Sequence, residues 1–329
     1  MRFFDVCNGD ADGLIARHQF RLSVPVASDD LTLVTGPKRD ITLLSNVKVN
    51  GPAAMQADVS VFDISYDQNE ESARRLLDAG ATIRYFDHHR ANLLRPHERL
   101  FAHIDTSPDT CTSLIVDRHL DGAHRHWAIA AAFGDNLIEV AEQLAIGQNL
   151  PAEKTLLLRQ LGECINYNAY GEMLSDLHYP PQEIARRMMP YQSPFEFVER
   201  EDIFSCLQIG FVADLQLAQA VLPIHSSSIA AVYVLPDERW ARRVSGVFAN
   251  TLVRAHTCRA HAVLSPVANG TYTVSIRAPH NNPQSADTIA IQFDKGGGRA
   301  AAAGIEDLPD RDITRLISFL ENSYGKSTA

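Results

Sequence analysis

Short hydrophobic runs alternate with longer amphipathic segments over the first hundred residues. The runs predict five strands, in the sequences MRFFDV, LTLVTG, DVSVFDIS, ATIRYFD and LFAHID. Between the third and fourth runs, Leu76 and Leu77 lie on one face of a helix predicted over residues 69–79. Because strands that alternate with helices build parallel sheets, we expect an α/β fold with a mostly parallel sheet.

The pattern changes twice further along the chain. From about Thr110 to Leu222 it is helical, in CTSLIVDRHL, WAIAAAF, AEKTLLLRQLGECI and FEFVEREDIFSCLQIGFVADLQLAQAVL, and the last run is long enough for one connecting helix. After Ser226 it predicts strands in IAAVYVL, RAHAVLS and TYTVSIRA, with helices in RRVSGVFANTLVRA and SADTIAIQF. A chain of 329 residues exceeds the usual size of a single core. We therefore expect a larger domain with a helical segment over residues 1–195, a connecting helix or linker over 196–225 and a smaller α/β domain over 226–329.

Charge differs between the two expected domains. The chain has 30 basic and 40 acidic side chains, of which residues 225–329 hold 11 and 9, so the preceding part is close to −12 and the last part close to +2. A strongly acidic body opposes non-specific binding along nucleic acid, which depends on Lys and Arg neutralising phosphates. It is compatible with a small phosphorylated ligand whose contacts are mediated by cations.

Targeting segments and cysteine spacing limit the class of protein further. No run of about 18 apolar residues occurs, so we expect no membrane span. The start, MRFFDVCNGD, enters a strand pattern without a secretory segment, which predicts a cytoplasmic protein. The five cysteines have no C-x-x-C spacing, which argues against a disulfide framework or a thiolate zinc site, and we expect them to be small buried residues.

Acidic residues and histidines follow several of the apolar runs. They are Asp10 and Asp12 in CNGDADG, Asp63 in FDIS, Asp87, His88 and His89 in FDHH, and Asp135 after AIAAAFG. Ligands gather at the carboxyl ends of parallel strands, so we expect these groups to lie together and to repel one another unless cations lie between them. Oxygen-rich sites with an imidazole favour Mn²⁺ or Mg²⁺. Two such ions about 3.5–4 Å apart activate water against phosphorus.

Simpler explanations exist for single residues. An Asp after a strand is often a turn former or a helix cap, and Asp12 could cap the helix GLIARHQF. The segment IDTSPDTCTS suits phosphate binding and ordinary N-capping equally well. For Lys38 and Arg39 in TGPKRDI we favour a solvated loop over contact with substrate. However, D-x-D-G, D-x-S and D-H-H in this order have little reason to arise from capping alone.

The motifs GDADG, FDIS, FDHH and FGDN resemble the successive motifs of the DHH phosphoesterase superfamily. TYTVSIRA followed by ADTIAIQFDKGGGRAAAAG is similar to the substrate-binding domain associated with that family. The resemblance covers most of the chain and implies a metal-dependent phosphoesterase acting on a phosphodiester or phosphomonoester of a small nucleotide-type substrate, such as a short oligonucleotide or a dinucleotide. Pyrophosphate or polyphosphate hydrolysis is an alternative, and so is a metal- and nucleotide-binding sensor with weakened turnover. The sequence leaves open whether the chain forms a homodimer.

The resemblance also implies a role for each residue of the motifs. It implies two Mn²⁺ ions, or Mg²⁺ in their place, with Asp63 bridging both, Asp10 holding the first, and Asp12, His88 and Asp135 holding the second. It places His89 beside the attacked phosphate, with Asp87 holding an imidazole N–H. A hydroxide between the two ions would then attack phosphorus in line.

The substrate-binding domain contributes the remaining expected contacts. By the resemblance, Arg277 pairs with a phosphate or carboxylate, and the backbone of Gly296, Gly297 and Gly298 approaches the ligand closely. The chain departs from the family pattern at two positions, with Asn8 where many members have a histidine and Arg299 where the glycine triplet usually precedes one. We expect Asn8 to be a weak ligand of the first metal ion and Arg299 to favour an anionic ligand.

Overall fold

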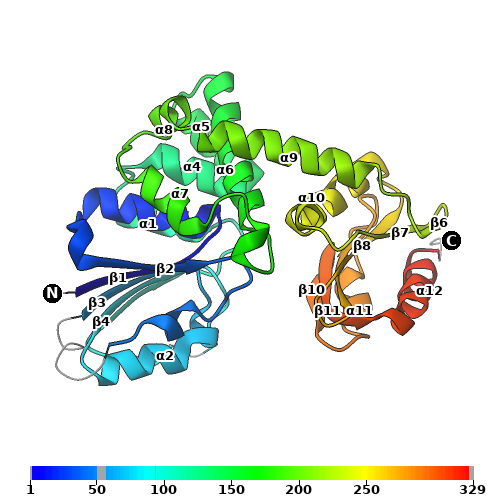
Figure 1. The fold of residues 1–329 in the computed structure, drawn as a ribbon, viewed down its shortest axis with the longest axis horizontal. Helices are drawn as coiled ribbons and strands as arrows, with labels where there is room; N and C mark the ends of the chain where they lie inside the picture. Colours follow the sequence, from blue (N-terminus) through cyan, green and yellow to red (C-terminus); the bar gives the residue numbers. More distant parts are fainter. Residues whose placement is uncertain (1, 50–56, 93, 326–329) are drawn as a thin grey trace. The chain divides into compact units, whose positions relative to one another are not determined.

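The computed structural model describes residues 2–49, 57–92 and 94–325. Met1, at the start of the first predicted strand, and residues 326–329, at the end of the smaller predicted domain, lie outside the described residues. The chain divides into two compact units, Met1–Ile209 and Gly210–Ala329. The boundary between them falls within helix α9 (Ile203–Gln219) (Figure 1).

The first unit contains a five-stranded sheet in the order β2-β1-β3-β4-β5. The strands are β1 (Arg2–Asn8), β2 (Leu31–Gly36), β3 (Ala57–Phe62), β4 (Thr82–Asp87) and β5 (Leu100–Ile104). Every neighbouring pair is parallel, which confirms the predicted α/β fold class and its parallel sheet. The carboxyl ends of all five strands therefore lie at one edge. β2 and β3 flank β1 on opposite sides, so this edge has its topological switch point beside β1.

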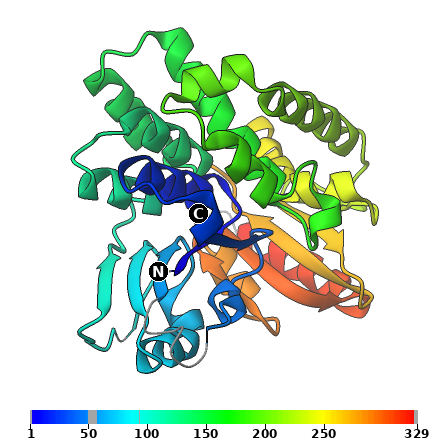
Figure 2. The same cartoon turned by 60° about the vertical axis from the view of Figure 1, so that its left-hand side comes forward.

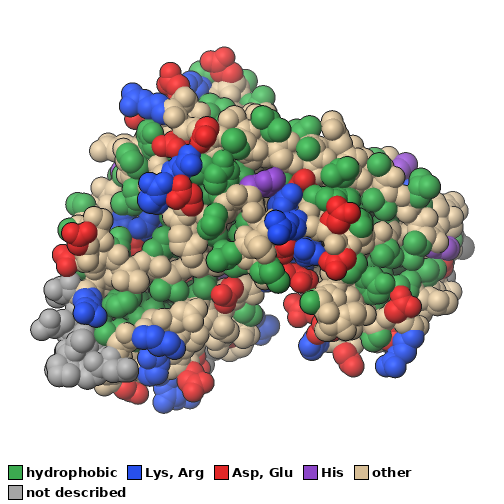
Figure 3. Space-filling view, in the orientation of Figure 1, with side chains coloured by type: hydrophobic (Ala, Val, Ile, Leu, Met, Phe, Trp, Pro, Cys, Tyr) green, Lys and Arg blue, Asp and Glu red, His purple; other side chains and the backbone are tan. Residues whose placement is uncertain are grey.

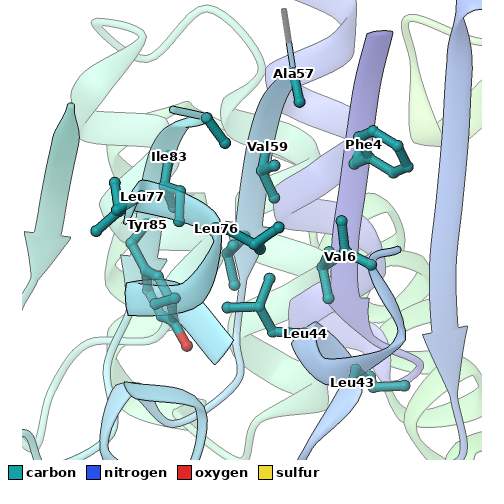
Figure 4. Packing of buried hydrophobic residues seen from close by; sticks show 14 of the residues in the cluster. Phe4, Val6, Leu43, Leu44, Ala57, Val59, Leu76, Leu77, Ile83 and Tyr85 are labelled. Carbon is teal, nitrogen blue, oxygen red and sulfur yellow. The ribbon is translucent and has the colours of Figure 1, made fainter. Parts of the chain in front are cut away.

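Helices cover both faces of this sheet. α1 (Ala11–Ser23) and α2 (Tyr66–Asp78) lie on opposite faces. Val59 and Val61 of β3 join the core that includes Leu76 of α2 (Figure 4), whereas Phe62 turns to the other face, where its ring centroid lies 5.6 Å from that of Phe20 in α1. Strands covered on both faces have nearly continuous apolar sequences, which is why the sequence predicts them well.

The helices that follow the sheet in the chain lie on the α1 side of it (Figures 1 and 2). They are α3 (Thr112–His119), α4 (Arg125–Gly134), α5 (Ile138–Gly147), α6 (Ala152–Ala169), α7 (Pro181–Met188) and α8 (Pro194–Arg200). A Cβ atom on Gly162 of α6 would lie 1.9 Å from the Ala130 oxygen of α4, and one on Gly134 would lie 2.6 Å from the Ala11 Cβ of α1. Glycine at these positions therefore lets α4 pack closely on both α6 and α1, and α4 ends beside the first turn of α1.

The single helix expected over residues 195–222 is not formed. The chain leaves helical geometry at Glu201, which is extended, and α9 starts at Ile203. Arg187 of α7 contacts the carboxylates of Glu201 at 3.3 Å and Asp202 at 2.5 Å, and the Tyr191 hydroxyl donates to Glu201 at 3.0 Å. These tertiary contacts hold the two acidic residues between the helices and separate α8 from α9.

The second unit has a six-stranded sheet in the order β10-β11-β9-β8-β7-β6, in which only the β7–β8 pair is parallel among the described strands. Its strands are β6 (His225–Ser226), β7 (Ala230–Val234), β8 (Ala260–Pro266), β9 (Thr271–Arg277), β10 (Gly296–Arg299) and β11 (Ala302–Pro309). Its helices are α10 (Arg239–Ala255), α11 (Ala286–Ala290) and α12 (Ile313–Tyr324). The unit encloses its own apolar core, which includes Val232, Ile276 and Leu316.

The expectation that the cysteines are small buried residues is confirmed for three of them and wrong for the other two. Cys7, Cys111 and Cys164 are buried, but Cys206 and Cys258 are exposed, and all five are free thiols. Among the described residues, no helix combines the length and the apolar character that crossing a membrane requires.

Candidate metal centre

The carboxyl edge of the first unit's sheet brings together most of the predicted metal ligands. Asp10 follows β1, Asp63 follows β3, and His88 and His89 follow β4. Asp135 follows α4, which Gly134 allows to end close to Ala11 at the start of α1. Residues that lie far apart in the sequence thus meet in one place because parallel strands end at one edge and a close helix contact adds the last carboxylate.

Asp12 lies in α1, but its carboxylate accepts hydrogen bonds at the start of α3 and does not cap α1. Asp10, and not Asp12, is the N-cap of α1, and its Oδ1 accepts from the Gly13 amide at 3.0 Å. The two carboxylate oxygens of Asp12 accept from the amides of Thr112 and Ser113, each at 2.7 Å, at the start of α3. These two amides of the IDTSPDTCTS segment are therefore already occupied by a carboxylate. Each Asp12 oxygen keeps a second lone pair for a further partner.

Asp63 leaves β3 in a strained conformation. Its φ of 58° lies in the left-handed region, which costs a residue with a Cβ on the order of 1–3 kcal/mol and is frequent at functional sites. Its Oδ1 accepts from the Thr112 hydroxyl at 3.1 Å and lies 3.4 Å from His88 Nε2. Burial, followed by the charges of Asp10 and Asp12, raises the pKa of Asp63 well above its usual range.

The two adjacent histidines have different environments. The His88 side chain is 21% exposed, and its Nδ1 lies 3.2 Å from the Thr110 carbonyl, so its Nε2 faces Asp63. The His89 side chain is 45% exposed, and its Nδ1 lies 2.7 Å from Oδ1 of the fully buried Asp87. His88 is therefore directed into the carboxylate cluster, and His89 is held by Asp87 with its ring partly open to solvent.

The charges of this cluster perturb its protonation equilibria. Burial lowers the pKa of His88, but its contact with Asp63 and the charges of Asp12 and Asp135 outweigh this effect and raise the pKa to about 10. Burial and the charge of Asp12 raise the pKa of Asp135 to about 6. The neighbouring carboxylates contribute to both shifts, and a bound cation would offset the negative charge that they concentrate.

Within the described ranges, two overlapping sets of side chains could hold a metal ion. One is Asp63, His88 and His89, and the other is Asp12, His88 and Asp135, with the potential ligand atoms of each set within 4.8 Å of one another. Carboxylate oxygens with one or two imidazoles suit Mn²⁺ and, less strongly, Mg²⁺. The residues present thus fit a divalent cation.

Asp10 belongs to neither set, and a lysine contacts its carboxylate. Lys38, which follows β2, lies with its Nζ 2.6 Å from Asp10 Oδ2. The favoured interpretation of Lys38 as part of a solvated loop is therefore wrong. The sequence shows a lysine shortly after a predicted strand. Its contact with Asp10 could be inferred only once β2 was known to pair with β1.

The residues expected to bind substrate lie in the second unit. Gly296 to Arg299 form β10, which pairs with β11, and β11 pairs with β9, so that Arg299, Ala302 and Arg277 are aligned across three strands. Gly298 has a φ of 147°, which favours glycine, and a Cβ on Gly296 would lie 1.8 Å from the Ala290 oxygen. Nε of Arg277 donates to Asn250 at 2.6 Å. The glycine triplet is a paired strand, and two of its three glycines are required by the local geometry.

Comparison with known proteins gives matches in structure only. No family model matches the sequence, and no curated protein matches it. RecJ of Thermus thermophilus in complex with Mn²⁺ matches with a TM-score of 0.66 and 16% identity over 99% of this chain. The match covers 52% of that RecJ, so the chain spans about half of its length.

Two further structures match over most of both chains. A manganese-bound exonuclease RecJ has a TM-score of 0.57 at 16% identity, with 99% of this chain and 90% of that one covered. A pGpG-specific phosphodiesterase, PggH of Vibrio cholerae, has a TM-score of 0.54 at 13% identity, with 99% of both chains covered. Together with the parallel sheet and the order of its strand-end motifs, these matches show that the chain has the fold of the DHH superfamily.

Proposed function

We propose that the protein is a metal-dependent phosphoesterase that hydrolyses a phosphate ester of a small nucleotide-type substrate, such as a dinucleotide or a short oligonucleotide. The observation that carries the proposal is the convergence of Asp12, Asp63, His88 and Asp135 at the carboxyl edge of the sheet. A cluster of buried carboxylates around one imidazole is costly without a cation, and its donor atoms suit Mn²⁺ or Mg²⁺.

The residues of the centre have distinct roles in this proposal. Asp12, Asp63, His88 and Asp135 hold the divalent cation, which when bound lowers the pKa of water and neutralises charge on phosphorus. Thr112 positions the Asp63 carboxylate through its hydroxyl, and the amides of α3 fix Asp12. The more exposed His89 faces the substrate, and Asp87 fixes the orientation of its ring.

Charge and similarity support a small substrate. RecJ structures with Mn²⁺ or Mg²⁺ and a pGpG-specific phosphodiesterase share the fold. Lys and Arg side chains are interspersed with Asp and Glu on the face of the molecule in Figure 3, as expected for a chain with a net charge of −10. Long nucleic acid would need a continuous basic surface. In this proposal Arg277 and Arg299, aligned across the second unit's sheet, contact the substrate's anionic groups.

A release assay tests the proposal. The purified protein is stripped with a chelator, restored with Mn²⁺ and offered linear dinucleotides, short oligonucleotides, cyclic dinucleotides, pyrophosphate and polyphosphate. We expect mononucleotide or phosphate release from one nucleotide class, reduced by roughly 10²- to 10³-fold in Asp63→Asn. Asp78→Asn, at an exposed position at the end of α2, is the matched control and should retain full activity.

The remaining outcomes separate the alternatives. Release from pyrophosphate or polyphosphate alone would replace the nucleotide substrate with an inorganic one. Binding of Mn²⁺ and a nucleotide without any release would favour the sensor. Full activity of Asp63→Asn would contradict the proposed centre.

A further inference from the structure

Lys38 places a fixed positive charge on one carboxylate of the centre. Its Nζ lies 2.6 Å from Asp10 Oδ2, and the Lys38 and Asp10 side chains are 27% and 3% exposed. Burial raises the pKa of Asp10, but the Lys38 charge and the hydrogen bonds from the Gly13 amide and Lys38 together outweigh this and hold the pKa below its ordinary value. An ion pair this buried persists because each charge compensates the other.

Other residues hold Lys38 in this position. Asn166 Oδ1 accepts from its Nζ at 3.3 Å, and its ammonium lies 5.3 Å from the centroid of the Tyr170 ring. The Lys38 amide donates to the Ala169 carbonyl at 3.0 Å. Three residues at the end of α6, Asn166, Ala169 and Tyr170, thus hold the backbone and the ammonium of Lys38 in place.

Asn8 completes this arrangement. Its Oδ1 accepts from the Asp10 amide at 3.3 Å, and its Nδ2 donates to the Lys38 carbonyl at 3.4 Å. The side-chain amide therefore links the turn that carries Asp10 to the loop that carries Lys38. An imidazole at position 8 would offer one acceptor nitrogen to a metal ion, whereas this amide is used in fixing the ion pair.

We propose that the Lys38 ammonium takes the place of one of the two divalent ions that the strand-end motifs lead one to expect. The chain then binds a single Mn²⁺ or Mg²⁺ through Asp12, Asp63, His88 and Asp135, while Lys38 neutralises Asp10 and supplies the second positive charge beside the phosphate. This inference rests on the proposed function of the centre. Because the ammonium lies 2.6 Å from Asp10 Oδ2, it repels a second divalent ion at this carboxylate and offsets the charge that would attract one.

Metal counting tests this inference without requiring turnover. Wild type, Lys38→Met and Lys295→Met are dialysed against Mn²⁺, and bound metal is measured per chain together with the electron paramagnetic resonance spectrum. Lys295→Met is the matched control because it also removes an ammonium from an Asp pair, with Asp307, but in the second unit. We expect one ion with an uncoupled spectrum in wild type and in Lys295→Met, and two ions with an exchange-coupled spectrum in Lys38→Met.

Each other outcome is decisive. Two coupled ions in wild type would overturn the inference while leaving the proposed function intact, and so would a single ion in a folded Lys38→Met. Absence of bound Mn²⁺ in every variant would overturn the proposed metal-dependent function together with the inference. If Lys38→Met does not fold, Lys38→Gln replaces it, and the wild-type count alone still decides between one ion and two.

Discussion

At the scale of single residues, the contact between Asp87 and His89 carries a specific expectation. Oδ1 of Asp87 lies 2.7 Å from His89 Nδ1 and accepts from the His89 amide at 3.1 Å. Because this carboxylate fixes the tautomer and the orientation of the ring, we expect Asp87→Asn to lower kcat by about 10- to 100-fold with unchanged metal content. Steady-state kinetics on the substrate found in the release assay, with metal analysis of the same samples, measure both quantities.

Asp67→Asn is the matched control for this prediction. Asp67 belongs to α2, and its carboxylate accepts from the backbone and side-chain amides of Asn92. We expect this variant to keep wild-type kcat. An active Asp87→Asn, or a loss explained entirely by missing metal, would contradict the positioning role of Asp87.

The residues of the centre differ in how visible they are in the sequence. Asp63 and His88 directly follow apolar strands, so their place at the sheet edge follows from the strand pattern. The contact of Lys38 with Asp10 does not follow from the strand pattern. It depends on the pairing of β2 with β1 and on the end of α6, about 130 residues away. Sequence reasoning thus identifies groups that are local to a motif, whereas contacts set by tertiary packing require the structure.

At the scale of elements, α1 is held by a buried neutral histidine. His18 Nε2 lies 2.9 Å from the Tyr191 carbonyl, and its ring packs edge-on against Trp127 of α4. Its Nδ1 has no hydrogen-bond partner among the described residues. Burial lowers the pKa of His18 to about 3, since a second ring proton would have no acceptor.

This shift predicts acid destabilisation of the first unit. The unfolded chain takes up a proton at His18 near pH 6.5 and the folded chain does not, so stability falls as the pH drops below about 6.5, by roughly 1.4 kcal/mol per pH unit. His18→Gln should make the slope between pH 6.5 and 4.5 shallower by about this amount, even where it lowers stability at pH 7. Urea denaturation at several pH values measures the slope. A slope as steep in His18→Gln as in wild type and in the exposed-site control His280→Gln would contradict the assignment.

The elements that the sequence fails to predict share a physical cause. The break at Glu201 results from side-chain contacts with Arg187, which no local pattern contains. β10 consists of three glycines and an arginine, and glycine has low strand propensity, so only its pairing with β11 makes it a strand. Elements with an apolar face are predictable, and elements fixed by their neighbours are not.

At the scale of the whole molecule, the metal centre and the expected substrate contacts belong to different units. Each unit has its own sheet and its own apolar core, one including Val61 and Leu76 and the other Val232 and Ile276. All residues proposed to hold the cation lie in Met1–Ile209, whereas Arg277 and Arg299 lie in Gly210–Ala329. Binding of the cation should therefore stabilise one cooperative unit directly.

Calorimetry of the 329-residue chain tests this separation. We expect two transitions, of which Mn²⁺ at 100 times its Kd raises only the one belonging to the first unit, by about 2.7 kcal/mol or roughly 5–10 °C. Asp63→Asn should abolish the Mn²⁺ shift, whereas Asp78→Asn should retain it. His18 lies in the first unit, so the transition whose temperature changes in His18→Gln belongs to that unit. This assignment does not depend on bound metal. A shift of both transitions by Mn²⁺, or a shift that persists in Asp63→Asn, would mean that the cation binds elsewhere or that the two units unfold as one.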